Sequence, residues 1–277
     1  MKKQIRLIAL DLDGTLLDDY KRLSENNRQA LTECARQGIQ VVPATGRPAD
    51  GIPKELRSIP GVRYAITTNG GAVVDLETGK RLSQCVLSNE QALQILDIVR
   101  QYHVMYDPYV QGRGITQFSF FEHMEEFGIS PAVQKLVRAT RDVVPDVYQY
   151  MVETKNCAEK INIFLADHSD KEILRERLSA IDGLAVSSSM YNNLEVNEKD
   201  ATKGNALLWL ADYLGIPREE TMALGDGEND ISMLKAAGIG IAMGNASDTV
   251  REAADEVTLT NERDGVAAAI RAWVLKQ

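Results

Sequence analysis

The sequence predicts an α/β protein in which a parallel sheet belongs to a core domain that is interrupted by an inserted α+β domain. Strand-like and helix-like segments alternate from residue 5 onward and again from residue 202 onward. Such alternation is typical of βαβ units with a parallel sheet. Between them, helix and strand candidates follow one another without that regularity. The 277 residues are enough for two domains, which we place at 1–82 with 200–277 for the core and at 83–199 for the inserted domain.

The first segment contains two strand candidates, residues 5–10 (IRLIAL) and 39–45 (IQVVPAT). The helix predicted between them starts at the candidate N-cap Ser24 and ends at Gly38. A further strand leads into a hairpin whose turn is ETGK. Pro43 lies inside the second strand, and because proline cannot donate a ladder hydrogen bond we expect that strand to end early.

The inserted segment should contain helices at residues 88–102 and 170–181, and strands at 160–166, 184–190 and 193–198. We interpret RDVVPD and EEFGIS as loops. After it the α/β pattern resumes with a helix from about Thr202 (TKGNALLWLADYLGI), a strand TMALGD and a strand GIGIAMG. Linkers that allow a hinge motion are expected near residues 82–88 and 195–202.

Composition and charge exclude several classes of function. A net charge of −9 argues against nucleic acid or an anionic membrane as the main partner. No apolar run approaches the roughly 18 residues that a membrane helix requires. The cysteines Cys34, Cys85 and Cys157 form no CxxC pair, so we expect reduced thiols and a cytoplasmic protein.

Polar side chains stand where the predicted parallel strands end, which is where such sheets bind ligands. The first strand leads into Asp11 and Asp13, and the second into Thr45. The strand TMALGD leads into Asp226, which is followed by Asn229 and Asp230. Lys203 lies in the first turn of the helix that starts near Thr202 and precedes this strand in the sequence.

Four acidic residues gathered at one sheet edge would repel one another and raise each other's pKa. A divalent cation removes that repulsion, and hard oxygen ligands suit Mg²⁺. Lys203 at a helix start makes sense if a phosphate or a carboxylate lies in front of it. The alternative is that each acid only caps a helix or forms a turn, which is plausible for Asp11 alone but not for the whole set.

These residues fall in four ordered motifs, DLDGTLL, ATGR, KGNAL and GDGENDISML. Together they resemble the haloacid dehalogenase (HAD) superfamily, and within it the Cof-type (subfamily IIB) sugar-phosphatase-like hydrolases, over essentially the whole chain. The resemblance implies a HAD-like Rossmannoid core with an inserted cap domain that sets substrate specificity. It also implies a Mg²⁺-dependent phosphatase that acts on small phosphorylated metabolites.

The resemblance also implies residue roles. Asp11 would attack phosphorus and form an aspartyl-phosphate, and Asp13 would act as general acid and then general base. Asp11, the backbone carbonyl of Asp13 and Asp226 would hold Mg²⁺, supported by Asp230. The groups implied to bind the phosphoryl oxygens are Thr45, Gly46, Lys203, Asn229 and the backbone amide of Leu12, with Arg47 as a substrate contact.

Two rival functions remain open. A phosphomutase would need basic residues on the inner face of the cap, and the candidates are Arg113, Lys135, Arg138, Arg141 and Lys160. A phospho-accepting signalling module also gathers acids, a threonine and a lysine at strand ends. Such modules are smaller and lack an acid two residues after the phosphorylated aspartate, so Asp13 and the long insert favour turnover of a phosphomonoester.

Overall fold

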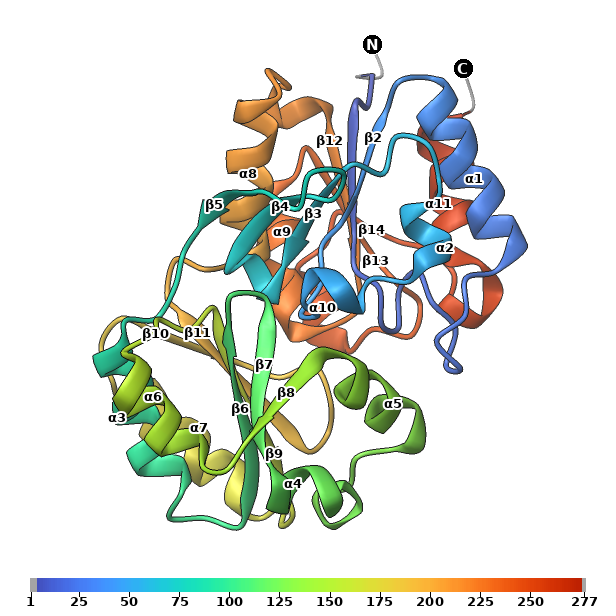
Figure 1. The fold of residues 1–277 in the computed structure, drawn as a ribbon. Helices are drawn as coiled ribbons and strands as arrows, with labels where there is room; N and C mark the ends of the chain where they lie inside the picture. The colour runs from blue at the N-terminus through green and yellow to red at the C-terminus, as the bar shows by residue number, and fades with distance from the viewer. Residues whose placement is uncertain (1–3, 276–277) are drawn as a thin grey trace. The chain divides into compact units, whose positions relative to one another are not determined.

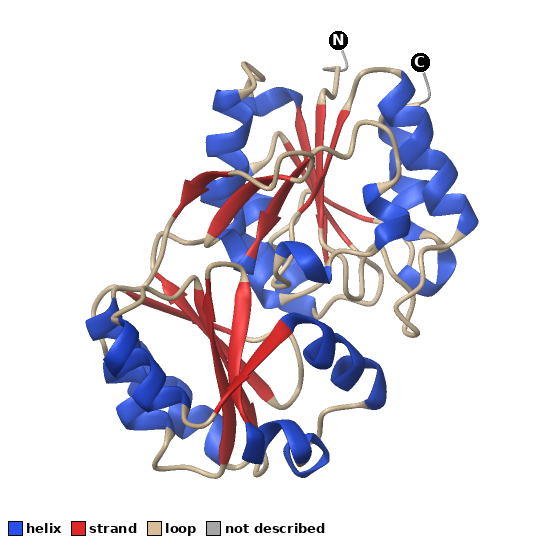
Figure 2. Cartoon of the chain, viewed as in Figure 1, coloured by secondary structure: helices blue, strands red, loops and turns tan. Residues whose placement is uncertain are grey.

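The computed structural model describes residues 4–275 and divides the chain into two compact units. The core unit consists of Met1–Ser83 and Thr202–Gln277, and the inserted unit consists of Gln84–Ala201. Figures 1 and 2 show both units, each with its own sheet and its own helices. None of the helices within residues 4–275 is long and apolar enough to cross a membrane.

The core unit is built on a five-stranded sheet in which every neighbouring pair is parallel. The strand order is β14-β13-β12-β1-β2. Their bounds are β1 Leu7–Leu10, β2 Gln40–Pro43, β12 Thr221–Gly225, β13 Ile239–Ala242 and β14 Glu256–Val257. The α/β class expected from the alternating pattern is therefore confirmed.

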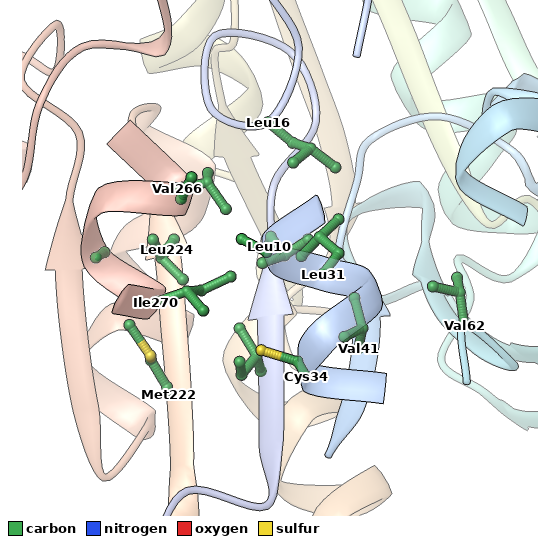
Figure 3. Close-up of a cluster of buried hydrophobic side chains, with 14 of the residues drawn as sticks. Leu10, Leu16, Leu31, Cys34, Val41, Val62, Met222, Leu224, Val266 and Ile270 are labelled. Carbon is green, nitrogen blue, oxygen red and sulfur yellow. The ribbon is translucent and has the colours of Figure 1, made fainter. Parts of the chain in front are cut away.

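Helices cover both faces of this sheet because its strands are apolar on both sides (Figure 1). Ile8 and Leu10 pack with α1 (Glu25–Arg36) and α11 (Gly265–Trp273), as the close-up in Figure 3 shows for Leu10, Leu31 and Ile270. Leu7 and Ala9 point the other way, because side chains alternate along a strand. They pack with α8 (Lys203–Tyr213) and α9 (Ile231–Ala236).

A smaller sheet of the order β3-β4-β5 completes the core unit. Its strands are β3 Tyr64–Thr67, β4 Ala72–Asp75 and β5 Arg81–Gln84. An isolated parallel bridge between Ala44 and Ile66 links β3 to the segment that follows β2. The short helices are α2 Lys54–Arg57 and α10 Asp248–Glu252, and the 3₁₀ turns are η1 Ala49–Gly51, η2 Thr68–Gly70, η4 Arg218–Glu220, η5 Glu228–Asp230 and η6 Asn261–Arg263.

Pro43 is accommodated because β2 is the edge strand of the five-stranded sheet and Pro43 is its last residue. The amides of Gln40 and Ala44 donate to Arg6 and Leu10 on the β1 side. The backbone N–H groups of alternate residues in a strand point to the same neighbouring strand, so the backbone nitrogen of Pro43 points away from β1. The ladder to β1 therefore loses no hydrogen bond.

The inserted unit contains a six-stranded mixed sheet of the order β10-β11-β9-β6-β7-β8. Its strands are β6 Val104–Val110, β7 Arg113–Gln117, β8 Arg141–Val144, β9 Lys160–Leu165, β10 Leu184–Ser187 and β11 Asn193–Glu198. Apolar side chains of one sheet face pack with three helices, α3 Asn89–Val99, α6 Val147–Thr154 and α7 Asp170–Ser179. Met105 and Phe164 pack with α5 (Pro131–Thr140) and the 3₁₀ turn η3 (Met124–Phe127). The remaining helix is α4, Phe118–Glu122.

The interpretation of RDVVPD as a loop was wrong, because its first four residues form β8. EEFGIS was also interpreted as a loop, and it begins inside η3. Both segments are short and charged, so their own sequences lack the alternation that marks a strand or the length that marks a helix. β8 exists because it pairs with β7, which is a tertiary effect.

Buried ion pairs lie in the sheet of the inserted unit. The Arg141 Nε atom donates to Asp107 Oδ2 at 2.5 Å, and Lys160 Nζ donates to Glu195 Oε1 at 2.9 Å. Both cations lie over the ring of Tyr109, 4.5 Å and 5.0 Å from its centroid. Burial favours the neutral form and raises the pKa of the Asp107 carboxyl, although Arg141 opposes that shift.

Removing one partner of such a pair should destabilise the inserted unit strongly. We expect Arg141→Met to lower the free energy of unfolding by about 3–5 kcal/mol, because it leaves the buried Asp107 without the guanidinium that pairs with it. Denaturant unfolding measures this. The exposed Arg138→Met is the control, and the double variant with Asp107→Leu should recover most of the loss. A loss below about 1 kcal/mol in Arg141→Met would contradict the interpretation of Arg141 and Asp107 as a buried ion pair.

Candidate active site

The parallel register brings the ends of β1 and β12 together. Leu10 pairs with Leu224, and the amide of Asp11 donates to the carbonyl of Leu224 at 3.0 Å. Asp11 thus directly follows β1 and Asp226 directly follows β12, at the carboxyl edge of the sheet. Residues separated by more than 200 positions become neighbours because two adjacent strands end at the same level.

Lys203 is the cation at this edge. It is the first residue of α8, whose N-cap Thr202 accepts a hydrogen bond from the amide of Asn205. Its ammonium is fully buried and donates to Asp11 Oδ1 at 2.7 Å and to Asp230 Oδ1 at 2.6 Å. Burial alone would lower the pKa of Lys203, but the two carboxylates outweigh it and raise the pKa. The two carboxylates therefore favour the charged form of Lys203.

Asp226 is fixed from two sides. Its Oδ1 accepts a hydrogen bond from Thr15 Oγ1 at 2.6 Å, and its Oδ2 accepts one from Asn245 Nδ2 at 3.4 Å. Gly14 has a φ of +91°, and a Cβ at that position would lie 2.3 Å from Asp226 Oδ2. The backbone of the DLDGTLL loop thus approaches this carboxylate as only glycine allows.

Asp230 has both of its oxygens engaged. Oδ1 accepts from Lys203, and Oδ2 accepts from the amides of Asp226 and Gly227, both at 2.9 Å. This carboxylate therefore orients the lysine and the loop that carries Asp226. Its remaining capacity to bind a metal directly is smaller than that of the other two acids.

The acids of this edge fit a divalent cation. One oxygen each from Asp11, Asp226 and Asp230 lies within 4.8 Å of the others. Burial, followed by the neighbouring acids, raises the pKa of Asp226 to about 7. The pKa of Asp11 is also raised by burial and by Asp230, although Lys203 opposes the shift. One lysine does not neutralise three carboxylates, of which Asp11 and Asp230 are buried and Asp226 is half-buried. Hard oxygen ligands in excess of positive charge suit Mg²⁺.

Asp13 is held in a separate ion-pair cluster. The Arg47 guanidinium donates to both of its oxygens, Nε to Oδ2 at 2.7 Å and Nη2 to Oδ1 at 2.6 Å. Lys21 Nζ lies 2.9 Å from Oδ1. Burial would raise the pKa of Asp13, but Arg47 and Lys21 outweigh it and hold the pKa well below its usual value. Arg47, expected to contact substrate, is thus engaged with Asp13 here.

The other candidate residues flank this cluster. Thr45 is buried, and its Oγ1 accepts from the amide of Arg47 at 3.1 Å, so Gly46 is enclosed in a tight turn. Leu12 has a fully buried side chain in the loop after β1. Asn229 Nδ2 donates to Asn69 Oδ1 at 3.1 Å.

Sequence reasoning missed several partners at this edge, namely Thr15, Lys21, Asn69 and Asn245. Thr15 stands inside the quoted DLDGTLL motif, so its position carried a readable signal. Asn245, which also donates to the carbonyl of Gly14 at 2.9 Å, has no local signal because only the pairing of β12 with β13 brings its loop here.

A family model described as haloacid dehalogenase-like hydrolase matches residues 8–270. The chain belongs to the haloacid dehalogenase-like hydrolase family. The match spans both units, so the resemblance carried by the four motifs is confirmed. Because this is a family of hydrolases, the chain is an enzyme.

Named relatives define its class within this family. The chain is 33% identical over 271 residues to the 5-amino-6-(5-phospho-D-ribitylamino)uracil phosphatase YcsE of Bacillus subtilis, covering 98% of this chain and 96% of that one. It is 30% identical to the pyridoxal phosphate phosphatase YbhA of Escherichia coli, covering 95% and 96%. A haloacid dehalogenase-like hydrolase structure from B. subtilis matches with a TM-score of 0.85 and 30% identity, covering 96% and 99%. This hydrolase is accordingly a Cof-type phosphatase.

Proposed function

We propose that this hydrolase releases inorganic phosphate from small phosphomonoesters through an aspartyl-phosphate at Asp11, with Mg²⁺ as its cofactor. The observation that carries the proposal is the Lys203 ammonium, which lies 2.7 Å from Asp11 at the edge where Asp226 and Asp230 also gather. A lysine so placed opposes the rise in the pKa of Asp11 that burial causes, and it adds positive charge where a phosphoryl group would bind.

In the first step, one carboxylate oxygen of Asp11 forms a bond to phosphorus as the ester P–O bond breaks. The leaving alkoxide takes a proton from Asp13. In the second step, the Asp13 carboxylate takes a proton from water, the water oxygen attacks phosphorus, and the bond to Asp11 breaks. Phosphate is released and both acids return to their starting states.

The cluster around Asp13 supports its base role. Arg47 and Lys21 keep its carboxylate ionised, which is the form that accepts a proton from water. To act as an acid in the first step, Asp13 must carry the proton that it took from water in the second step of the preceding turnover, and a protonated Asp13 binds Arg47 more weakly. We propose that Arg47 turns to the substrate phosphate at that point.

The residues expected to hold Mg²⁺ are Asp11, Asp226 and the backbone carbonyl of Asp13, with Asp230 orienting its neighbours. Bound there, the ion would supply Lewis-acid stabilisation of charge on the phosphoryl oxygens. Thr45, Gly46, Lys203, Asn229 and the amide of Leu12 are our proposed ligands of the remaining phosphoryl oxygens.

The substrate class is proposed from the relatives. YcsE and YbhA are named for phosphorylated small molecules, one a ribityl phosphate and the other pyridoxal phosphate. We infer a sugar phosphate or a phosphorylated cofactor as the substrate here.

The three cysteines are free thiols, which suits action in a reducing cytoplasm.

Metal dependence tests the cofactor. We expect phosphate release from a panel of sugar phosphates, 5-amino-6-(5-phospho-D-ribitylamino)uracil and pyridoxal phosphate in Mg²⁺. The rate should fall at least about 100-fold in EDTA, because the three gathered carboxylates then face too little positive charge, and this is also why the pKa values of Asp11 and Asp226 are raised. Added Mg²⁺ should restore the rate, and Ca²⁺, with its longer bonds and looser geometry, should not.

Other outcomes of that panel would contradict the metal site or favour a different function. Equal rates in Mg²⁺ and EDTA would contradict the metal site. Turnover that needs a sugar bisphosphate activator would favour a phosphomutase, although Arg141 and Lys160 are already paired with Asp107 and Glu195. A stable phosphorylated Asp11 without turnover would favour a signalling module.

A further inference from the structure

We propose that Asn69 is a positioning residue of this active site, which acts by holding the side-chain amide of Asn229. The inference rests on the proposed function, in which Asn229 binds a phosphoryl oxygen. Asn229 Nδ2 donates to Asn69 Oδ1 at 3.1 Å, and Asn69 is 4% exposed. An asparagine amide has two N–H donors and one acceptor oxygen in one plane. A bond that fixes one N–H therefore fixes the direction of the other donor and of the oxygen.

The backbone that carries Asn69 is costly to form. The connection between β3 and β4 contains three successive residues with positive φ, Thr68 at 50°, Asn69 at 62° and Gly70 at 102°. A positive φ is tolerated by glycine and asparagine but is a real outlier for a β-branched residue such as threonine. A simple hairpin needs only Asn-Gly at a two-residue turn. Strain of this kind persists only where the surroundings enforce it.

The surroundings that enforce this turn are parts of the active site. The amide of Thr68 donates to the carbonyl of Arg47, and the amide of Asn69 donates to the carbonyl of Thr45, both at 3.1 Å. A Cβ on Gly70 would lie 2.3 Å from the carbonyl oxygen of Thr202, the N-cap that precedes Lys203.

The turn at residues 68–70 thus contacts the loop of Thr45, the start of α8 and the side chain of Asn229. Figure 1 shows β3 and β4 beside α8 within the core unit. The hairpin therefore ties together three separate segments that supply proposed phosphate ligands. Asn69 is the member whose side chain reaches one of those ligands directly.

A double-variant cycle tests this role. Glycine accepts a positive φ, so Asn69→Gly removes the side chain without adding backbone strain. We expect it to lower kcat/KM for the best panel substrate about tenfold, as loss of one well-formed hydrogen bond predicts. In an Asn229→Ala background the same change should alter kcat/KM less than about twofold, because two residues that act as a unit are not additive.

Lys155→Gly is the matched control, since Lys155 also has a positive φ of 53° but is exposed at the end of α6 in the inserted unit. It should leave kcat/KM unchanged. Equal losses from Asn69→Gly in both backgrounds, or no loss in the wild-type background, would overturn the proposal. If Asn69 had a purely structural role, Asn69→Gly would lower both the unfolding temperature and kcat/KM, whatever residue stands at position 229.

A binding measurement separates this inference from the proposed function. In Mg²⁺, inorganic phosphate should raise the unfolding temperature of the wild type more than that of Asn69→Gly. If the wild type hydrolyses no ester, the proposed function fails, but a phosphate shift that depends on Asn69 would still support the positioning role. Equal phosphate shifts in the wild type and Asn69→Gly would contradict it even in an active enzyme.

Discussion

Asp11→Asn should abolish phosphate release, with a loss in kcat of at least about 10³-fold for every substrate of the panel. An amide of the same shape cannot attack phosphorus. The fold should be retained, because the pKa of Asp11 is raised by burial and by its acidic neighbours. Its charge is therefore unfavourable in the metal-free protein, and we expect the unfolding temperature of the variant in EDTA to equal or exceed that of the wild type.

The control for this variant is Asp212→Asn, an exposed carboxyl on α8 that should change neither rate nor unfolding temperature. Phosphate release by Asp11→Asn within tenfold of the wild type would exclude Asp11 as the nucleophile. An unfolding temperature of Asp11→Asn below that of the wild type in EDTA would contradict the claim that the charge of Asp11 is unfavourable in the metal-free protein.

Lys203→Met should cost both stability and activity. The methionine fills much of the volume but leaves Asp11 and Asp230 buried without their shared cation, so the free energy of unfolding in EDTA should fall by about 3–5 kcal/mol. We expect kcat/KM to fall at least about 100-fold, since charge stabilisation at the phosphoryl oxygens is lost. Denaturant unfolding and initial rates measure the two effects.

Lys235→Met on the exposed side of α9 is the matched control and should be neutral in both measurements. Added Mg²⁺ should recover part of the stability lost by Lys203→Met, because it binds the same carboxylates. A variant as stable as the wild type in EDTA would show that Lys203 does not compensate these acids.

Much of the fold was predictable because the signals are local. The apolar runs of β1, β2 and β12, the cap at Ser24 and the alternation of strands with helices all stand in the sequence. The β6–β7 hairpin and β8 were not identified. β6 contains Asp107 and Pro108, and β8 begins with Arg141, so their strand character depends on pairing across the sheet rather than on alternation.

The site could be predicted only as a set of strand-end residues. Motif order indicated that Asp11, Asp226 and Lys203 share an edge, but not that Asp230 would use both oxygens on Lys203 and the backbone. Nor could it show that Arg47 pairs with Asp13, because that pairing depends on side-chain geometry across two loops. The Asn69–Asn229 contact joins residues 160 positions apart, and no periodicity encodes it.

The central claim is that Asp11 carries the phosphoryl group during turnover, and trapping tests it most directly. Enzyme mixed with its best substrate in Mg²⁺ would be quenched during turnover and treated with borohydride, which reduces an acyl phosphate to the alcohol. Peptide mass spectrometry should then find homoserine at position 11, in amounts that follow the steady-state level of the intermediate and vanish in Asp11→Asn. Homoserine at another carboxyl, or none at any position in an enzyme that releases phosphate and is trapped under single-turnover conditions, would contradict the account.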